Sequence, residues 1–103
     1  MGTPVTVAVD SATRRPGLLG RTGLADGEAL VIAPTSAIHT FGMKFPIDVV
    51  FARRDGRVVK LREAIPPNRI SAAWGAFAAI ELAAGTIART GLVRGDRLQI
   101  RRA

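Results

Sequence analysis

The fold of this chain is decided by the stretch His39–Phe51, which reads His-Thr-Phe-Gly-Met-Lys-Phe-Pro-Ile-Asp-Val-Val-Phe. From Phe45 onward every second residue is large and apolar. A period of two in apolar residues is typical of a β-strand with one buried face. The pattern therefore predicts a strand over residues 45–51, with Asp48 on the face away from the core.

A hairpin is predicted after this strand, because an Asp-Gly pair stands between two apolar runs. A two-residue loop would pair Phe51 with Lys60 and mix apolar with charged positions. A three-residue loop over residues 54–56 pairs Phe51 with Val59 and keeps the apolar faces together. Since a slip by one residue would turn the apolar set toward water, we expect the three-residue loop, with Gly56 in the left-handed conformation.

The expected register also fixes the surroundings of Asp48. It places this carboxylate directly opposite Arg62, and opposite charges that face each other across two strands stabilise a sheet. We therefore interpret Asp48 first as one half of a cross-strand ion pair and only second as a residue for chemistry.

Three segments of the chain carry a family resemblance. Ser36–Phe51 resembles the signature of domain-of-unknown-function family 192, small conserved proteins with a Met-x-x-x-(Ile/Pro)-Pro-(Leu/Ile)-Asp core. Arg15–Arg21 is similar to the family's Arg-x-x-Gly-Leu-(Leu/Met)-x-Arg element. Ala79–Gly85 is similar to its Val-Leu-Glu-x-x-x-Gly element, and Gly91–Asp96 follows. The elements occur in the family's order, and the similarity spans about residues 13–100.

The resemblance implies a fold but no established reaction. We expect a mainly β (β-rich α+β) structure, a compact jelly-roll-like sandwich or partial barrel with one or two short helical segments. Many members carry Asn-Thr after the methionine, where this chain reads Met43-Lys44-Phe45-Pro46. A role tied to that Asn-Thr pair is therefore not carried over.

The remaining elements are predicted from shorter patterns. Alternating valines indicate a strand over residues 4–9, and an apolar run that ends at Pro34 indicates one over residues 29–33. Residues 71–82 are rich in alanine, which favours a helix. Residues 76–82 within them alternate and match a family element, so we expect a strand there. Ile80 and Leu82 would then face the core.

The C-terminal part is predicted to begin with a short helix. Residues 86–90 suit one or two helical turns, with Thr86 as cap and Gly91 as terminator. A turn and a last strand over residues 97–100 follow. Residues 34–44 are expected to form a loop or an irregular strand that holds His39.

The whole chain has 103 residues, which predicts a single domain over residues 1–103. No apolar run reaches the length of a membrane span. The chain has no cysteine, so disulfides, thiol catalysis and thiolate metal sites are excluded. We expect a cytoplasmic protein. The alternative is an exported protein from which a leader sequence was removed.

The charge is strongly basic, at +7. Arginine dominates it and suits phosphate and carboxylate recognition. A G+C-rich genome would produce the same composition on any solvated surface. Nucleic acid is further disfavoured because few aromatic residues are available to stack on bases. The candidates for binding a polyanion are Arg53, Arg54, Arg57 and Arg62.

Three hypotheses for the function remain. The first is a non-enzymatic binding or accessory domain, with a polar pocket for a small polar ligand or a protein partner lined by His39, Thr40, Asp48, Glu81 and Arg21. The second is a small hydrolase or metal-assisted enzyme that uses His39 with Asp48 or Glu81. The third is arginine-mediated binding of nucleic acid or another polyanion. We expect binding rather than catalysis, no cofactor and no metal, because paired histidines and a phosphate-cradling loop are missing.

Overall fold

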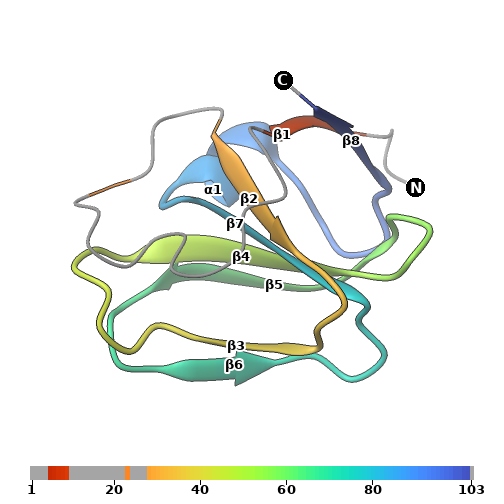
Figure 1. Ribbon diagram of the computed structural model, residues 1–103. Helices are drawn as coiled ribbons and strands as arrows, with labels where there is room; N and C mark the ends of the chain where they lie inside the picture. Colours follow the sequence, from red (N-terminus) through yellow and green to blue (C-terminus); the bar gives the residue numbers. More distant parts are fainter. Residues whose placement is uncertain (1–4, 10–22, 24–27, 103) are drawn as a thin grey trace.

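The computed structural model describes residues 5–9, 23 and 28–102 (Figure 1). Its elements in chain order are β1 (Val5–Val9), β2 (Ala29–Ile32), β3 (Ala37–His39), β4 (Ile47–Ala52), β5 (Val58–Ile65), β6 (Ile70–Ala72), β7 (Ala78–Ala83), α1 (Thr86–Thr90) and β8 (Leu98–Arg102). The class is mainly β with one short helix, as the sequence predicts.

Three sheets make up the described structure. The central one is antiparallel with the order β2-β7-β4-β5. An antiparallel pair, β3-β6, which we call the ribbon, lies over one face of it, and a parallel pair, β1-β8, joins the two ends of the chain (Figure 1). The sheets form stacked layers and are not closed into a barrel.

The central strand β4 is buried on both faces, which corrects the expectation of one buried face. Ile47, Val49 and Phe51 belong to the ribbon-side cluster, and Val50 and Ala52 belong to the helix-side cluster. The alternation in the sequence therefore separates two cores, where we expected it to separate a core from solvent.

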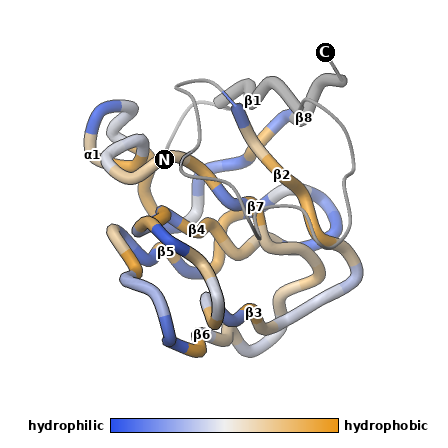
Figure 2. The backbone as a smooth tube through the Cα atoms, turned by 60° about the vertical axis from the view of Figure 1, so that its left-hand side comes forward, coloured by the Kyte–Doolittle hydropathy of each residue, from blue (hydrophilic) through white to orange (hydrophobic). Residues whose placement is uncertain are grey.

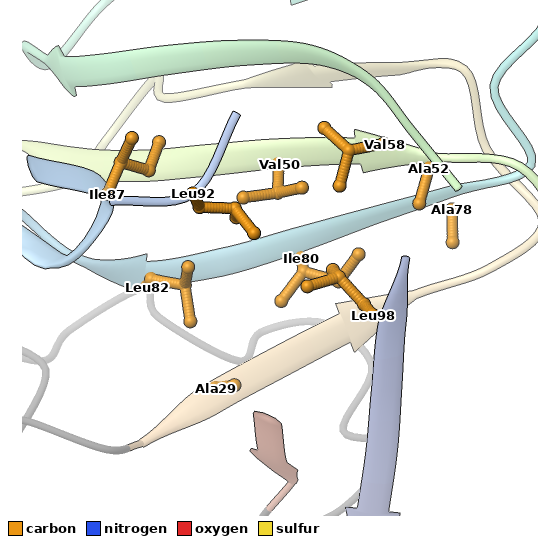
Figure 3. Close-up of a cluster of buried hydrophobic side chains, with 10 residues drawn as sticks. All are labelled: Ala29, Val50, Ala52, Val58, Ala78, Ile80, Leu82, Ile87, Leu92 and Leu98. Carbon is orange, nitrogen blue, oxygen red and sulfur yellow. The ribbon is translucent and has the colours of Figure 1, made fainter. Parts of the chain in front are cut away.

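Each cluster collects apolar residues from distant parts of the chain. The ribbon-side cluster consists of Leu30, Ile38, Met43, Ile47, Val49, Phe51, Ile65, Ala73 and Ala79. The helix-side cluster, drawn in Figure 3, consists of Ala29, Val50, Ala52, Val58, Ala78, Ile80, Leu82, Ile87, Leu92 and Leu98. Figure 2 shows that the strands β2 and β7, which run between the two clusters, are predominantly hydrophobic.

The register predicted for the hairpin is correct next to the turn but wrong along the rest of the two strands. The Arg53 N–H donates to the Arg57 carbonyl at 2.9 Å, so the loop has the predicted three residues, and Ala52 pairs with Val58. A bulge then shifts the pairing, and Phe51 lies opposite Lys60. The bulge lets two successive residues of β5 oppose one residue of β4, which periodicity alone does not reveal.

The shifted register also removes the predicted ion pair of Asp48. Arg62 lies opposite Val49, on the ribbon side, whereas Asp48 lies on the helix side. A second irregularity, between Ile47 and Val49, separates them further, and there Ala64 adopts a φ of 49°.

The other predicted elements are mostly present. β2 ends before Pro34, and β7 is a strand whose Ile80 and Leu82 point into the helix-side cluster. β5 runs on to Ile65, beyond the predicted hairpin. β6 is a strand that the sequence did not predict, because it has three residues and follows two prolines.

The short helix α1 ends as predicted but begins differently. Gly91 terminates it in the left-handed conformation, with φ 70°, and donates its N–H to the Ile87 carbonyl. The N-cap is Gly85, which corrects the expected Thr86 cap. The Thr86 hydroxyl donates a hydrogen bond backward to the Ala83 carbonyl at 2.7 Å, so it does not cap the N–H groups in the first turn of the helix.

Candidate functional site

His39 lies on the outer face of the ribbon. Its neighbour Ile38 points into the ribbon-side cluster, and successive side chains of a strand alternate between faces. The His39 ring stacks on Phe41 with centroids 5.4 Å apart, and its Nδ1 accepts the Phe41 N–H at 3.2 Å. Nδ1 therefore serves as an acceptor, which places the proton of the neutral ring on Nε2.

Thr40 is a buried structural junction. Its hydroxyl donates to the Pro66 carbonyl at 2.7 Å and accepts the Arg69 N–H at 2.8 Å. Its carbonyl accepts the N–H groups of Met43 and Asn68. Thr40 is completely buried, so it holds the end of the ribbon together and presents no atom to a ligand.

Asp48 is fully buried and both of its oxygens are used by the backbone. Oδ1 accepts the Ala64 N–H at 2.8 Å, and Oδ2 accepts the Ile87 N–H at 2.8 Å. Ile87 lies in the first turn of α1, so Asp48 caps this helix from another element. The residue that attracted a catalytic interpretation thus connects β4, β5 and α1.

The three residues of the enzyme hypothesis do not converge. Glu81 pairs with Val49 and therefore lies on the ribbon side of the central sheet. Asp48 pairs with Leu82 and lies on the helix side. His39 points away from both, on the outside of the ribbon. Arg21, the fifth candidate for the polar pocket, lies outside the described residues.

The candidate arginines fall into two groups. Arg53, Arg54 and Arg57 are exposed around the β4–β5 turn. Arg62 lies further along β5, on the ribbon side, and its Nη1 donates to the Ser71 hydroxyl at 3.3 Å. The four side chains therefore do not form one continuous basic face.

The β4–β5 turn also contains one perturbed carboxyl group. Asp55 accepts the Arg57 N–H at 3.0 Å, and this hydrogen bond lowers the pKa of the Asp55 carboxyl below its ordinary value. The positive charges of Arg97, Arg57 and Arg53 lower the pKa further. The Asp55 carboxylate lies 3.6 Å from the Arg97 guanidinium.

Sequence reasoning missed an exposed apolar surface around His39. Trp74 is 98% exposed, Ile70 67% and Phe41 47%. Ile70 lies opposite His39 across the ribbon, and Trp74 stands in the turn after β6. Phe41 follows β3 at one end of the ribbon, and Trp74 follows β6 at the other end. We call the surface along the ribbon that carries His39, Phe41, Ile70 and Trp74 the outer ribbon face. Its sequence signal was a single tryptophan beside a glycine, Trp74-Gly75, in a segment without charge.

Cations surround the outer ribbon face. The Lys60 Nζ donates to the Ala72 carbonyl at 2.6 Å, so Lys60 and Arg62 both reach the β6 edge. Arg69 and Lys44 are exposed at one end of the ribbon. The sequence has no Asp or Glu between residues 29 and 47 or between residues 64 and 80, so the segments that build the ribbon carry positive charge only.

In the described part of the chain, no group of three or more His, Asp or Glu side chains could hold a metal ion. None of the helices within that part is long and apolar enough to cross a membrane.

Comparison with known proteins places the chain among proteins without an assigned function. Residues 2–100 match the family model DUF192, described as "Uncharacterized ACR, COG1430". No curated protein matches. A protein of unknown function from Novosphingobium aromaticivorans is similar in structure, with a TM-score of 0.73 and 27% identity, over 89% of this chain and 70% of that one. A protein from Sinorhizobium meliloti, provisionally named as a transcription regulator, gives a TM-score of 0.74 and 25% identity, over 89% of this chain and 76% of that one.

Proposed function

This chain belongs to the DUF192 family of uncharacterised proteins, and we propose from its own surface that it is a non-enzymatic binding domain for single-stranded nucleic acid. The binding surface is the outer ribbon face. The observation that carries the proposal is Trp74, whose side chain is almost completely exposed in the turn after β6. Ile70 and Phe41 are exposed further along the ribbon, and the segments that build the ribbon carry only positive charge.

An unpaired base can stack on an exposed aromatic ring. Base stacking on an aromatic side chain contributes about 1–3 kcal/mol per base and tolerates any sequence, because every base has a flat face. Trp74 offers one free ring, and Phe41 offers a second one that His39 already holds in place by stacking. The objection from the sequence, that few aromatic residues are available to stack on bases, does not apply to this face.

The surrounding cations supply the second half of such a site. A groove that binds single strands combines stacking rings with positive charge along the phosphates. Lys60 and Arg62 line the β6 edge, and Arg69 and Lys44 lie at the end of the ribbon. With both base and phosphate partners on one face, single strands fit better than a duplex, whose base faces are hidden by stacking.

Two other observations agree with binding rather than catalysis. His39 is separated from Asp48 and Glu81, so the acid–base arrangement that the enzyme hypothesis requires does not form. The similar protein from Sinorhizobium meliloti carries a name in transcription regulation, an activity that involves nucleic acid.

The experiment uses the single tryptophan of the chain as its own reporter. A short fluorescein-labelled oligothymidylate is titrated with protein by fluorescence anisotropy, and Trp74 emission is followed with the unlabelled oligonucleotide. We expect saturable binding that quenches Trp74. Trp74→Ala should weaken the affinity by about 5- to 150-fold, the loss of one stacked base.

Salt dependence and a charge-matched control complete the test. Arg62→Gln should lower the slope of log affinity against log salt by about one. Arg94→Gln, an exposed arginine whose turn packs on the start of β5, should change that slope less. Oligonucleotide binding that leaves Trp74 emission and the Trp74→Ala affinity unchanged would contradict the proposal. So would binding of an acidic peptide, but of no oligonucleotide, through Trp74.

A further inference from the structure

We infer that the chain has a second binding site, at the β4–β5 turn, for a small carboxylate with an apolar body, such as a medium-chain fatty acid. The site is a cavity of about 260 Å³ on the helix side of the central sheet, the side opposite the ribbon. It is lined by apolar side chains at its base and by arginine at its mouth.

Small residues at the ends of adjacent strands create the hollow. Ala52 and Ala78 are paired across β4 and β7, and Figure 3 shows them side by side at one end of the helix-side cluster. Ala33 follows β2 at the same end of the sheet. Because alanine fills less space than its neighbours Val31 and Ile80, these positions leave room that no described side chain occupies.

The size and the lining of the cavity indicate what the apolar part of the ligand must be. Binding pockets for drug-sized molecules have about 300–1,000 Å³ and mostly apolar walls with a few polar groups. A cavity of about 260 Å³ is slightly smaller, so it suits a ligand that is smaller than a drug-sized molecule. Its walls include Phe77, Ile80 and Leu98, which favour an aliphatic chain or a single ring.

The charge at the mouth selects the head group. Arg53 and Arg54 line the opening, and the Arg54 guanidinium carbon lies 4.3 Å from the centre of the Phe77 ring. The planar guanidinium binds a carboxylate through two parallel hydrogen bonds. Arg53 acts on Asp55 only through its charge, and the ion pair at this turn joins Asp55 to Arg97. Both guanidinium groups can therefore donate hydrogen bonds to an anion.

The one carboxylate at the opening already has partners. Asp55 accepts the Arg57 N–H and lies 3.6 Å from Arg97. The backbone on that side is also fixed, because the Leu98 N–H donates to the Gly56 carbonyl at 2.8 Å. The turn therefore presents Arg53 and Arg54 over the cavity while Asp55 is held by Arg57 and Arg97.

The test compares three probes that separate the contribution of the apolar chain from that of the carboxylate. Octanoate has both groups, 1-octanol has only the apolar chain, and acetate has only the carboxylate. We expect saturable amide shifts at Gly56, Phe77 and Ala78 in a two-dimensional NMR titration with octanoate, with a Kd of roughly 0.1–10 mM. Octanol should bind at least about threefold more weakly, and acetate should cause no localised shifts.

A pair of arginine variants tests the head-group contact. Arg54→Gln should weaken octanoate binding by about three- to tenfold, because it removes a charge-assisted hydrogen bond. Arg94→Gln removes an equal charge from a turn outside the cavity lining and should leave the Kd within about twofold. Octanol and octanoate binding equally well, or octanoate shifts that avoid the three cavity amides, would overturn the inference in the wild-type protein even if a variant did not fold.

Discussion

Asp48 joins three elements of the molecule through one carboxylate. Its oxygens accept the N–H of Ala64, at an irregular point of β5, and the N–H of Ile87, in the first turn of α1. A backbone donor that is buried without a partner costs about as much as a lost hydrogen bond. Asp48 thus satisfies two donors that neither the ladder nor a local cap can reach.

Replacing Asp48 with asparagine should destabilise the fold. The amide has nearly the same shape but only one acceptor oxygen, so one of the two N–H groups would face an NH₂ group. We expect the free energy of unfolding to fall by about 1–3 kcal/mol in urea denaturation. Asp55→Asn is the control, because this carboxylate is exposed at a turn, and its unfolding midpoint should change little. An Asp48→Asn variant as stable as the wild type would show that a side-chain rotation or water replaces the lost acceptor.

At the scale of elements, the β4–β5 hairpin is specified by its turn and distorted by its bulge. Gly56 has a φ of 91°, a conformation that favours glycine, and its carbonyl accepts the Leu98 N–H. A Cβ atom at Gly56 would collide with the Leu98 carbonyl oxygen. The turn therefore requires glycine for two reasons, its own backbone and the close approach of β8.

Two glycine-to-alanine variants separate these reasons. Gly95 has a φ of 96° and nothing within 4 Å of an added Cβ, so Gly95→Ala should cost only the conformational strain, about 1–2 kcal/mol. Gly56→Ala should cost about 1–3 kcal/mol more, because the added atom meets backbone that moves with difficulty. Thermal or urea unfolding of both variants measures the difference. Equal losses would mean that β8 moves away at little cost.

At the scale of the whole molecule, one sheet separates two hydrophobic clusters. The ribbon closes the first cluster, and α1 with β8 closes the second. The clusters have no residue in common, and the backbone of β4 and β7 lies between them. We therefore expect the two cores to respond independently to small changes in volume.

A double-mutant cycle tests this independence. Ile38→Val removes a methyl group from the ribbon-side cluster, and Ile87→Val removes one from the helix-side cluster. Each should lower the free energy of unfolding by about 0.5–1.5 kcal/mol. The double variant should lose the sum to within about 0.5 kcal/mol, as distant sites do. A coupling energy clearly above that value would show that the sheet transmits packing changes from one cluster to the other.

The sequence by itself determined the mainly β class, the strand at β4, the three-residue turn and the end of α1 at Gly91, because alternation and glycine positions are local signals. It also determined β7, against the helix propensity of its alanines. These features depend on interactions between residues that are close together in the sequence.

Tertiary structure alone decided what each side chain faces. Distant segments cover the second face of β4, bulges set its register, and the backbone of β5 and α1 converts Asp48 from a predicted ion-pair partner into a cap. The outer ribbon face is decided in the same way, since Trp74 is exposed whereas its neighbour Ala73 packs into the ribbon-side cluster. Burial and register depend on contacts between residues far apart in the chain, and periodicity contains no information about those contacts.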